Sequence, residues 1–197
     1  MDDLDAYRGT ALYDDLVRIR SYYASIEHDF DLFTGHFSIS CPTVCGRCCE
    51  RFIPDVTRLE ALAIAQTLVD VQGRDLDFLE HWSMSHSACP LYDPSSHRCT
   101  AYAVRPIVCR VFCSAASRTR RGLRFGGCAL PEEGSRVDAI DEEGLTSSGI
   151  RIPLMDEYGE AVDELQSSCE RKLLDEAVLE EAGRIMLYQS MIDQGAS

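Results

Sequence analysis

The sequence predicts a mainly α-helical protein, with helices at both ends packed around an irregular cysteine-rich metal-binding centre and at most a small β element. Apolar residues recur at helical spacing near both ends, and nine of the ten cysteines lie between residues 41 and 128. Cysteine is otherwise sparse and buried, so this crowding needs a chemical reason. With 197 residues, we predict a single domain at 1–197, comprising a cysteine-cluster core at 41–128 and a C-terminal helical region at 154–193.

The N-terminal part of the chain predicts one helix and then a loop. Residues 3–27 are expected to be helical because apolar residues alternate at steps of four and three, at Leu12, Leu16, Ile19, Tyr23 and Ile26. Residues 28–40 contain Gly35 between several aromatic residues, and this mixture predicts a loop packed over the core.

The middle of the chain carries clear helix and turn signals. Thr57-Arg-Leu-Glu60 has the form of a capping box, so a helix is expected to begin there and to end at Gly73. A shorter helix is predicted at 75–83, with Leu76, Leu79 and Trp82 inward. Residues 93–96 predict a turn. Residues 107–113 fit a strand or a short helix, and 119–125 a short strand.

The C-terminal part predicts a linker followed by helix. Residues 131–149 are rich in Glu, Asp, Gly and Ser, which is typical of an exposed loop or mobile linker. Pro153 limits residues 150–154 to a short edge strand. The remainder is expected to be helical, and one face is marked by Leu174, Val178, Ala182, Ile185 and Ile192.

The cysteines form two groups whose chemistry depends on the compartment. The N-terminus lacks the basic and apolar regions of a secretory signal, and no stretch approaches ~18 consecutive apolar residues, so we expect a cytoplasmic protein. In that reducing compartment clustered thiols more often bind metal than form disulfides. We predict that the two groups converge on one centre, with candidate metal ligands Cys41, Cys45, Cys48, Cys49, Cys89, Cys99, Cys109 and Cys113. Cys128 is the weakest candidate, and Cys169 is excluded.

The charge of the chain restricts its partners. A net charge of −14 argues against general binding to nucleic acid or to an anionic membrane. The expected partner is a protein or peptide whose identity the sequence does not indicate. One basic island stands beside the second cysteine group, at Arg105, Arg110, Arg118, Arg120, Arg121 and Arg124. These arginines either offset the charge of the thiolates or line a pocket for an anionic substrate.

A specific run of residues covers both cysteine groups. Cys45-x-x-Cys48-Cys49 is followed by Cys-Pro-Leu at 89–91 and by Cys99-x-x-Tyr102-x-x-Arg105-Pro106-x-x-Cys109-Arg110-x-Phe112. This run resembles the CxxCxxCC cysteine-cluster family (YkgJ type), a zinc- or iron-chelating domain usually associated with an iron–sulfur cluster. Tyr102, Arg105 and Arg110 are candidate cofactor-binding residues that donate to thiolate sulfur, and the alternative is that they pack or bond backbone carbonyls.

Three functions follow from this resemblance and from the thiols. The first is a metal-cluster protein, iron–sulfur (a [4Fe–4S] cluster) in preference to zinc. The second is a zinc-stabilised binding module without chemistry of its own. The third is a cluster-dependent enzyme, because flagellin lysine N-methylases carry a similar motif and imply methyl transfer to a protein or peptide.

Overall fold

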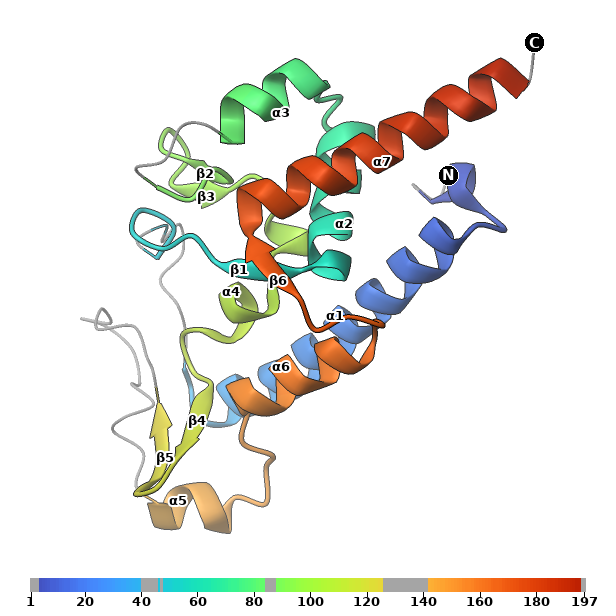
Figure 1. Cartoon of the computed structure of the whole chain (residues 1–197). Coiled ribbons are helices and arrows are strands. Elements are labelled where there is room, and N and C mark those ends of the chain that lie inside the picture. The colour runs from blue at the N-terminus through green and yellow to red at the C-terminus, as the bar shows by residue number, and fades with distance from the viewer. Residues whose placement is uncertain (1–3, 40–45, 47, 84–87, 126–141, 196–197) are drawn as a thin grey trace.

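The computed structural model describes residues 4–39, 46, 48–83, 88–125 and 142–195. Within these ranges the chain forms mainly helices and three small two-stranded sheets, so the predicted fold class is confirmed (Figure 1). The helices are α1 (Ala11–His36), α2 (Arg58–Gln66), α3 (Leu76–Ser83), α4 (Ile107–Val111), α5 (Glu142–Ser147), α6 (Met155–Glu164) and α7 (Leu174–Gly195). The strand pairs are β1 (Asp55–Thr57) with β6 (Arg171–Leu173), β2 (Tyr92–Asp93) with β3 (Arg98–Cys99), and β4 (Ala116–Thr119) with β5 (Gly122–Phe125). No helix in these ranges is both long and apolar enough to traverse a membrane.

Helix α2 occupies the centre of the main core. Every residue from Leu59 to Gln66 is buried, and α1 and α7 pack on either side (Figure 1). Helix α3 lies against α7, and α6 lies against α1 and α4. A helix that is apolar on all faces is stable only inside such a layer.

Helix α1 differs from the predicted helix at both ends. It begins at Ala11, where the Thr10 hydroxyl accepts a hydrogen bond from the backbone of Tyr13, and it continues to His36. The loop predicted at 28–40 is therefore wrong over 28–36. The buried face runs on from Ile26 to Phe33, so the aromatic residues extend the helical periodicity and do not interrupt it.

The predicted start of α2 is confirmed, and the helical path that continues beyond its last residue, Gln66, stops at Gly73 as predicted. Thr57 and Glu60 form a reciprocal capping box, and Gly73 adopts φ +64, the left-handed conformation that glycine favours at a helix end. Between them the chain passes through one π-helical turn at Thr67–Val71. Helix α3 also matches its prediction and buries Leu79, but Leu76 is exposed and not inward as predicted.

The C-terminal third contains more elements than the sequence indicated. Residues 142–147, predicted as linker, form α5, and a second small core joins Leu145 to Phe33 and Ile39. The predicted strand at 150–154 is reduced to one bridge between Leu154 and Ala116. The predicted C-terminal helix is divided into α6 and α7 by strand β6.

The β1–β6 pair ties the C-terminal third to the segment that follows the first cysteine group. Asp55 lies opposite Leu173, and Thr57 lies opposite Arg171. The ladder continues through the Leu174 amide, which donates to the Pro54 carbonyl at 3.0 Å. Helix α7 is thereby fixed over α2, with its N-terminus beside the cysteine-rich part of the chain (Figure 1).

Candidate metal centre

A backbone hydrogen bond joins the two cysteine groups. The Cys89 amide donates to the Cys49 carbonyl at 2.7 Å, although forty residues separate them. Cys48 and Cys49 lie in a tight turn, in which the Arg51 amide donates to the Cys48 carbonyl at 3.3 Å. Cys89 is buried in the main core, and Cys49 packs against that core. The predicted convergence of the two groups is therefore seen at this pair.

The β2–β3 hairpin places Cys99 at the same point. Tyr92 and Cys99 are opposite residues of the hairpin, and the Tyr92 amide donates to the Cys89 carbonyl at 2.9 Å. The predicted turn at 93–96 is confirmed, because the Asp93 carboxylate accepts hydrogen bonds from Ser95 and Ser96. These bonds hold the pKa of Asp93 at about 2, since they favour the ionised carboxylate.

Gly46 lies in close contact with this hairpin. A Cβ at Gly46 would lie 2.2 Å from the Tyr92 ring and 2.9 Å from the His97 carbonyl oxygen. The Tyr92 hydroxyl also donates to Glu50 at 3.0 Å, so the ring is tied to the turn that carries Cys48 and Cys49. Only a residue without a side chain lets the cysteine loop rest on the hairpin at this distance.

Helix α4 carries Cys109, and a buried carboxylate from α2 anchors its first turn. The Ile107 amide donates to Glu60 Oε1 at 2.9 Å, and Glu60 Oε2 accepts from the Thr57 amide at 2.9 Å. The Glu60 side chain is only 2% exposed. It therefore caps the N-terminus of α2 and also accepts a hydrogen bond from a backbone amide in the first turn of α4 that has no partner within that helix. Through this bond, the position of Cys109 depends on the segment that directly follows the first cysteine group.

Arg110 fixes the loop between Cys99 and Cys109. Its buried guanidinium donates to the carbonyl oxygens of Ala103 and Arg105 and pairs with Glu27 of α1. It also lies 3.9 Å from the centre of the Tyr23 ring, in cation–π contact. Of the two interpretations of Arg110, these contacts match the bonding of backbone carbonyls around the ligand loop.

Tyr102 and Arg105 form a pair on the surface of the same loop. Arg105 lies 3.9 Å from the centre of the Tyr102 ring and donates to the Tyr102 carbonyl at 2.9 Å. The Arg105 charge favours the Cys99 thiolate and offsets part of the increase in the pKa of Cys99 that burial causes. The bond of Arg105 to the Tyr102 carbonyl matches the alternative interpretation, in which the arginine bonds a backbone carbonyl, and its influence on Cys99 is through charge alone. A cofactor-binding role for the pair stays a prediction.

The thiols of the two groups influence one another electrostatically. Burial raises the pKa of Cys89 to about 11, and the neighbouring Cys99 and Cys48 act in the same direction. Burial also raises the pKa of Cys109, with further contributions from Cys89, Cys99 and Cys48. The Cys49 thiol donates to Cys48, which lowers the pKa of Cys48 and raises that of Cys49. Burial and mutual repulsion therefore oppose the simultaneous ionisation of these thiols, and a bound cation would offset that repulsion.

The remaining cysteine candidates are one described residue and three that lie outside the described part of the chain. Cys113 lies beyond the end of α4, where its sulfur is 3.5 Å from the Ser114 hydroxyl. Cys41, Cys45 and Cys128 lie outside the described residues. Cys169, which we excluded, is exposed on the connection between α6 and β6 and is not in a helix. The seven described cysteines are free thiols, and within the described ranges no three His, Cys, Asp or Glu side chains are grouped so that they could hold a metal ion.

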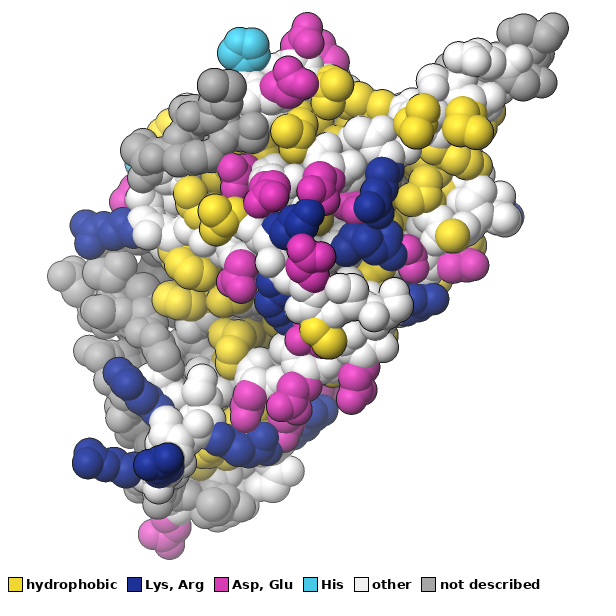
Figure 2. Space-filling view, viewed as in Figure 1, with side chains coloured by type: hydrophobic (Ala, Val, Ile, Leu, Met, Phe, Trp, Pro, Cys, Tyr) yellow, Lys and Arg dark blue, Asp and Glu magenta, His cyan; other side chains and the backbone are white. Residues whose placement is uncertain are grey.

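The basic island separates into two parts. Arg105 and Arg110 belong to the cysteine centre, whereas residues 118–124 form the β4–β5 hairpin at another end of the molecule (Figure 1). Arg118 pairs with Asp156 and Glu157 of α6. Lys and Arg side chains project from this hairpin in Figure 2, which is consistent with the exposure of Arg120, Arg121 and Arg124. The hairpin arginines therefore balance carboxylates of α6 or face solvent.

The sequence does not predict two contacts that position the cysteine centre, one made by Glu60 and one by Gly46. Glu60 was recognised as a capping residue, but its bond to Ile107 spans 47 residues and leaves no local signal. Gly46 lay inside the cysteine motif, where its contact with Tyr92 was not foreseen. A buried carboxylate on an otherwise apolar helix was the one clue available, because such a charge requires partners.

Comparison with protein families identifies the cysteine-rich segment. Residues 40–129 match the CxxCxxCC family model, described as "Putative zinc- or iron-chelating domain". The predicted resemblance to this family is therefore confirmed, and the match covers both cysteine groups and helix α4. Comparison with curated proteins and with solved structures found no match.

Proposed function

We propose that the zinc- or iron-chelating segment at 40–129 binds an iron–sulfur cluster through thiols from both cysteine groups. The observation that carries the proposal is the hydrogen bond between Cys89 and Cys49, which brings the second group to the first. A bound cluster would link segments distant in the sequence and would supply one-electron chemistry.

The donor set is made of sulfur. Cys48, Cys49, Cys89, Cys99 and Cys109 are the ligand candidates among the described residues, and Cys41, Cys45 and Cys113 are candidates from their spacing. Two described histidines are occupied elsewhere, since His97 bonds the Tyr92 hydroxyl and His81 bonds the Asp77 carbonyl. A single structural zinc takes four ligands. The larger number of thiols favours a centre with several metal ions.

The proposal includes a reducing, cytoplasmic setting. Its support is that all seven described cysteines are free thiols. Such thiols persist where disulfides are rare.

Anaerobic purification followed by metal and sulfide analysis tests the proposal. We expect a brown protein that contains iron and acid-labile sulfide and absorbs in the visible range. A colourless protein with stoichiometric zinc would contradict the proposal and indicate a zinc-stabilised module, because zinc has no redox chemistry and does not absorb visible light.

Two serine variants test the assignment of the ligands. Cys109→Ser is expected to lose the metal, whereas Cys169→Ser, at an exposed position outside both groups, is expected to retain it. Both changes remove one thiol from one chain, so Cys169→Ser controls for general oxidation and handling. Full retention in Cys109→Ser would show that Cys109 is not a ligand.

A further inference from the structure

The β4–β5 hairpin is positively charged, although the chain as a whole has a net charge of −14. Residues 94–131 contain no Asp or Glu, and all seven basic residues of this segment are arginines. Four of these arginines belong to the hairpin and its turn, namely Arg118, Arg120, Arg121 and Arg124. The charge of the hairpin is therefore opposite in sign to the net charge of the protein.

The inner face of the hairpin is anchored on the body of the molecule. Ala116 lies opposite Phe125, and Arg118 follows on the same face because side chains alternate along a strand. Ala116 is 0% exposed, and the Phe125 ring stacks on Phe33 of α1 with ring centroids 6.5 Å apart. Arg118 pairs with two carboxylates of α6. The one arginine on this face is thus neutralised, and the hairpin is fixed against α1 and α6.

The outer face and the turn carry the other three arginines. Arg124 lies opposite Ser117 on the outer face, and Arg120 and Arg121 form the turn between the two strands. All three are exposed, and basic side chains project from the hairpin at the lower left of Figure 2. Among the residues that the structure describes, their side chains have no hydrogen-bond or ion-pair partner. Three positive charges are therefore available to a partner on one short element.

The turn that carries Arg120 and Arg121 is held in one conformation. The Thr119 hydroxyl donates to the Gly122 carbonyl at 2.7 Å and accepts from the Arg121 amide at 3.2 Å. Gly122 adopts φ +105, a conformation that glycine reaches without strain, and neither arginine has a positive φ. The backbone of the turn is therefore ordered before any partner binds, which reduces the entropy that binding costs.

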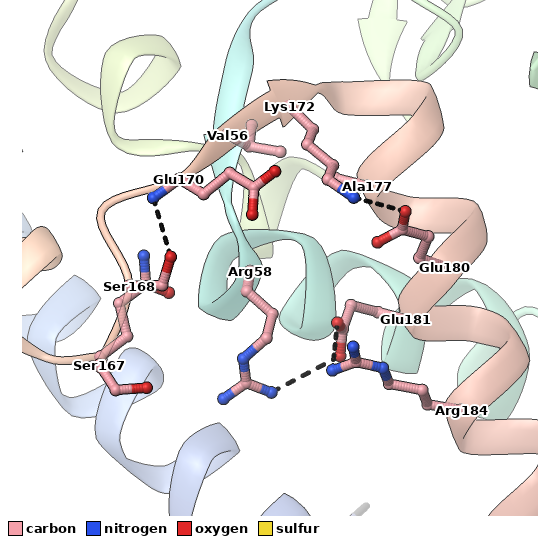
Figure 3. Close-up of a pocket in the computed structure, with 11 residues that line it drawn as sticks. Val56, Arg58, Ser167, Ser168, Glu170, Lys172, Ala177, Glu180, Glu181 and Arg184 are labelled. Atoms are coloured by element: carbon pink, nitrogen blue, oxygen red, sulfur yellow. Dashed lines mark hydrogen bonds and ion pairs between the residues drawn. The ribbon is translucent and has the colours of Figure 1, made fainter.

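The basic side chains around the pocket between β6 and α7 show the opposite arrangement. There Lys172 pairs with Glu180 at 2.6 Å, and Arg184 pairs with Glu181 at 3.0 Å (Figure 3). The hairpin arginines have no such partners in the described part of the chain, although the protein contains 33 acidic and only 19 basic residues. Neighbouring like charges repel one another, so an anionic partner would relieve this repulsion.

The residue type and the size of the hairpin restrict the chemistry of that partner. The planar guanidinium of arginine matches a carboxylate or a phosphate through two parallel hydrogen bonds. A long polyanion such as nucleic acid would extend past the hairpin and meet carboxylates of α6, among them Asp156 and Glu157. Strands of four residues span only ~13 Å, which suits about four residues of an extended peptide. These features favour a short acidic segment of a protein.

We propose that the outer face and turn of the β4–β5 hairpin dock an acidic segment of a partner protein. Its carboxylates accept hydrogen bonds from Arg120, Arg121 and Arg124. Because the inner face is already packed on α1 and α6, docking requires no rearrangement of the fold. No cysteine takes part, so failure of this proposal would leave the proposed metal function unchanged.

Fluorescence anisotropy of a labelled hexaglutamate peptide tests the proposal on the intact protein. The measurement is made at low ionic strength, because salt screens exposed charges. Hexaglutamate is expected to bind with a Kd below about 1 mM, and hexaglutamine at least about tenfold more weakly. If hexaglutamate does not bind in this range, or if a DNA duplex binds the hairpin more tightly, the assignment of an acidic protein segment is wrong.

A triple variant locates the docking site. Changing all three docking arginines should lower the affinity for hexaglutamate by at least about tenfold and leave the metal content unchanged. The variant is Arg120→Gln/Arg121→Gln/Arg124→Gln. Unchanged binding would place the peptide elsewhere on the protein and overturn the assignment.

A matched control separates docking at the hairpin from the effect of net charge. It replaces three exposed arginines that already contact a carboxylate or an aromatic ring, as Arg8→Gln/Arg18→Gln/Arg74→Gln. Both triple variants have the same net charge, so the control should bind hexaglutamate within about twofold of the parent protein. An equal loss of affinity in the two variants would show that only the overall charge matters and would refute the proposal.

Discussion

Replacing Glu60 by glutamine tests the link between the first cysteine group and α4. The Glu60 carboxylate accepts hydrogen bonds from the Thr57 amide at 2.9 Å, from the Thr57 hydroxyl at 3.0 Å and from the Ile107 amide at 2.9 Å. Glutamine keeps one acceptor oxygen, so at least one of the two buried amides loses its partner. A buried unpaired donor costs ~1–3 kcal/mol, and a hydrogen bond to a charged group contributes ~1.5–3 kcal/mol. We expect the free energy of unfolding to fall by roughly 2–3 kcal/mol, a large part of the ~5–15 kcal/mol of a typical domain.

The same change should weaken metal binding beyond its effect on stability. The Ile107 amide belongs to the first turn of α4, so its loss frees the helix that carries Cys109. Urea unfolding of the metal-free protein measures the first effect, and metal retention during competition with a chelator measures the second. Glu181→Gln is the matched control, because Glu181 is equally buried at 2% but its ion pairs go to Arg58 and Arg184.

Comparing metal release in the two variants shows whether Glu60 positions Cys109. Glu60→Gln should release metal faster than Glu181→Gln at a similar loss of stability. If both variants retain metal equally well, Glu60 serves only as the cap of α2, and the inference that it positions Cys109 is refuted.

Three further predictions concern the surroundings of the centre. Gly46→Ala should lower the free energy of unfolding by ~1–3 kcal/mol and weaken metal retention, because its Cβ would meet the Tyr92 ring at 2.2 Å. Gly35→Ala is the control: the position has open space around it, so the change should be neutral or stabilising in thermal unfolding. Arg110→Lys should lower the free energy of unfolding by ~2–4 kcal/mol, since lysine cannot reach two carbonyls and Glu27 together; an unchanged urea midpoint would contradict this role. Arg120→Gln and Arg121→Gln should keep their metal, because solvent screens exposed charges that lie more than a Debye length, roughly 8 Å, from the thiols. Loss of metal without unfolding would show that the hairpin arginines do act on the cysteine centre.

Local patterns in the sequence determined the helical class and several boundaries. The spacing of Leu16, Ile19, Tyr23 and Ile26 indicated the buried face of α1, and the capping box at Thr57 and Glu60 gave the start of α2. These features depend on residues three or four apart, which the sequence displays directly. The cysteine spacing together with the Tyr…Arg-Pro…Cys-Arg-x-Phe run likewise indicated the chelating family.

The tertiary structure alone decided how the centre is assembled. Cys49 meets Cys89, Glu60 binds Ile107 and Arg110 pairs with Glu27, across separations of 40, 47 and 83 residues. The same holds for the end of α1, where packing of Phe33 against Leu145 and Phe125 extends a helix that composition had suggested would stop. Contacts of this kind have no period along the chain, because they depend on how α1, α2 and α4 pack in space. The sequence therefore determined which residues are available for the centre, and the packing of distant segments determined which of them meet.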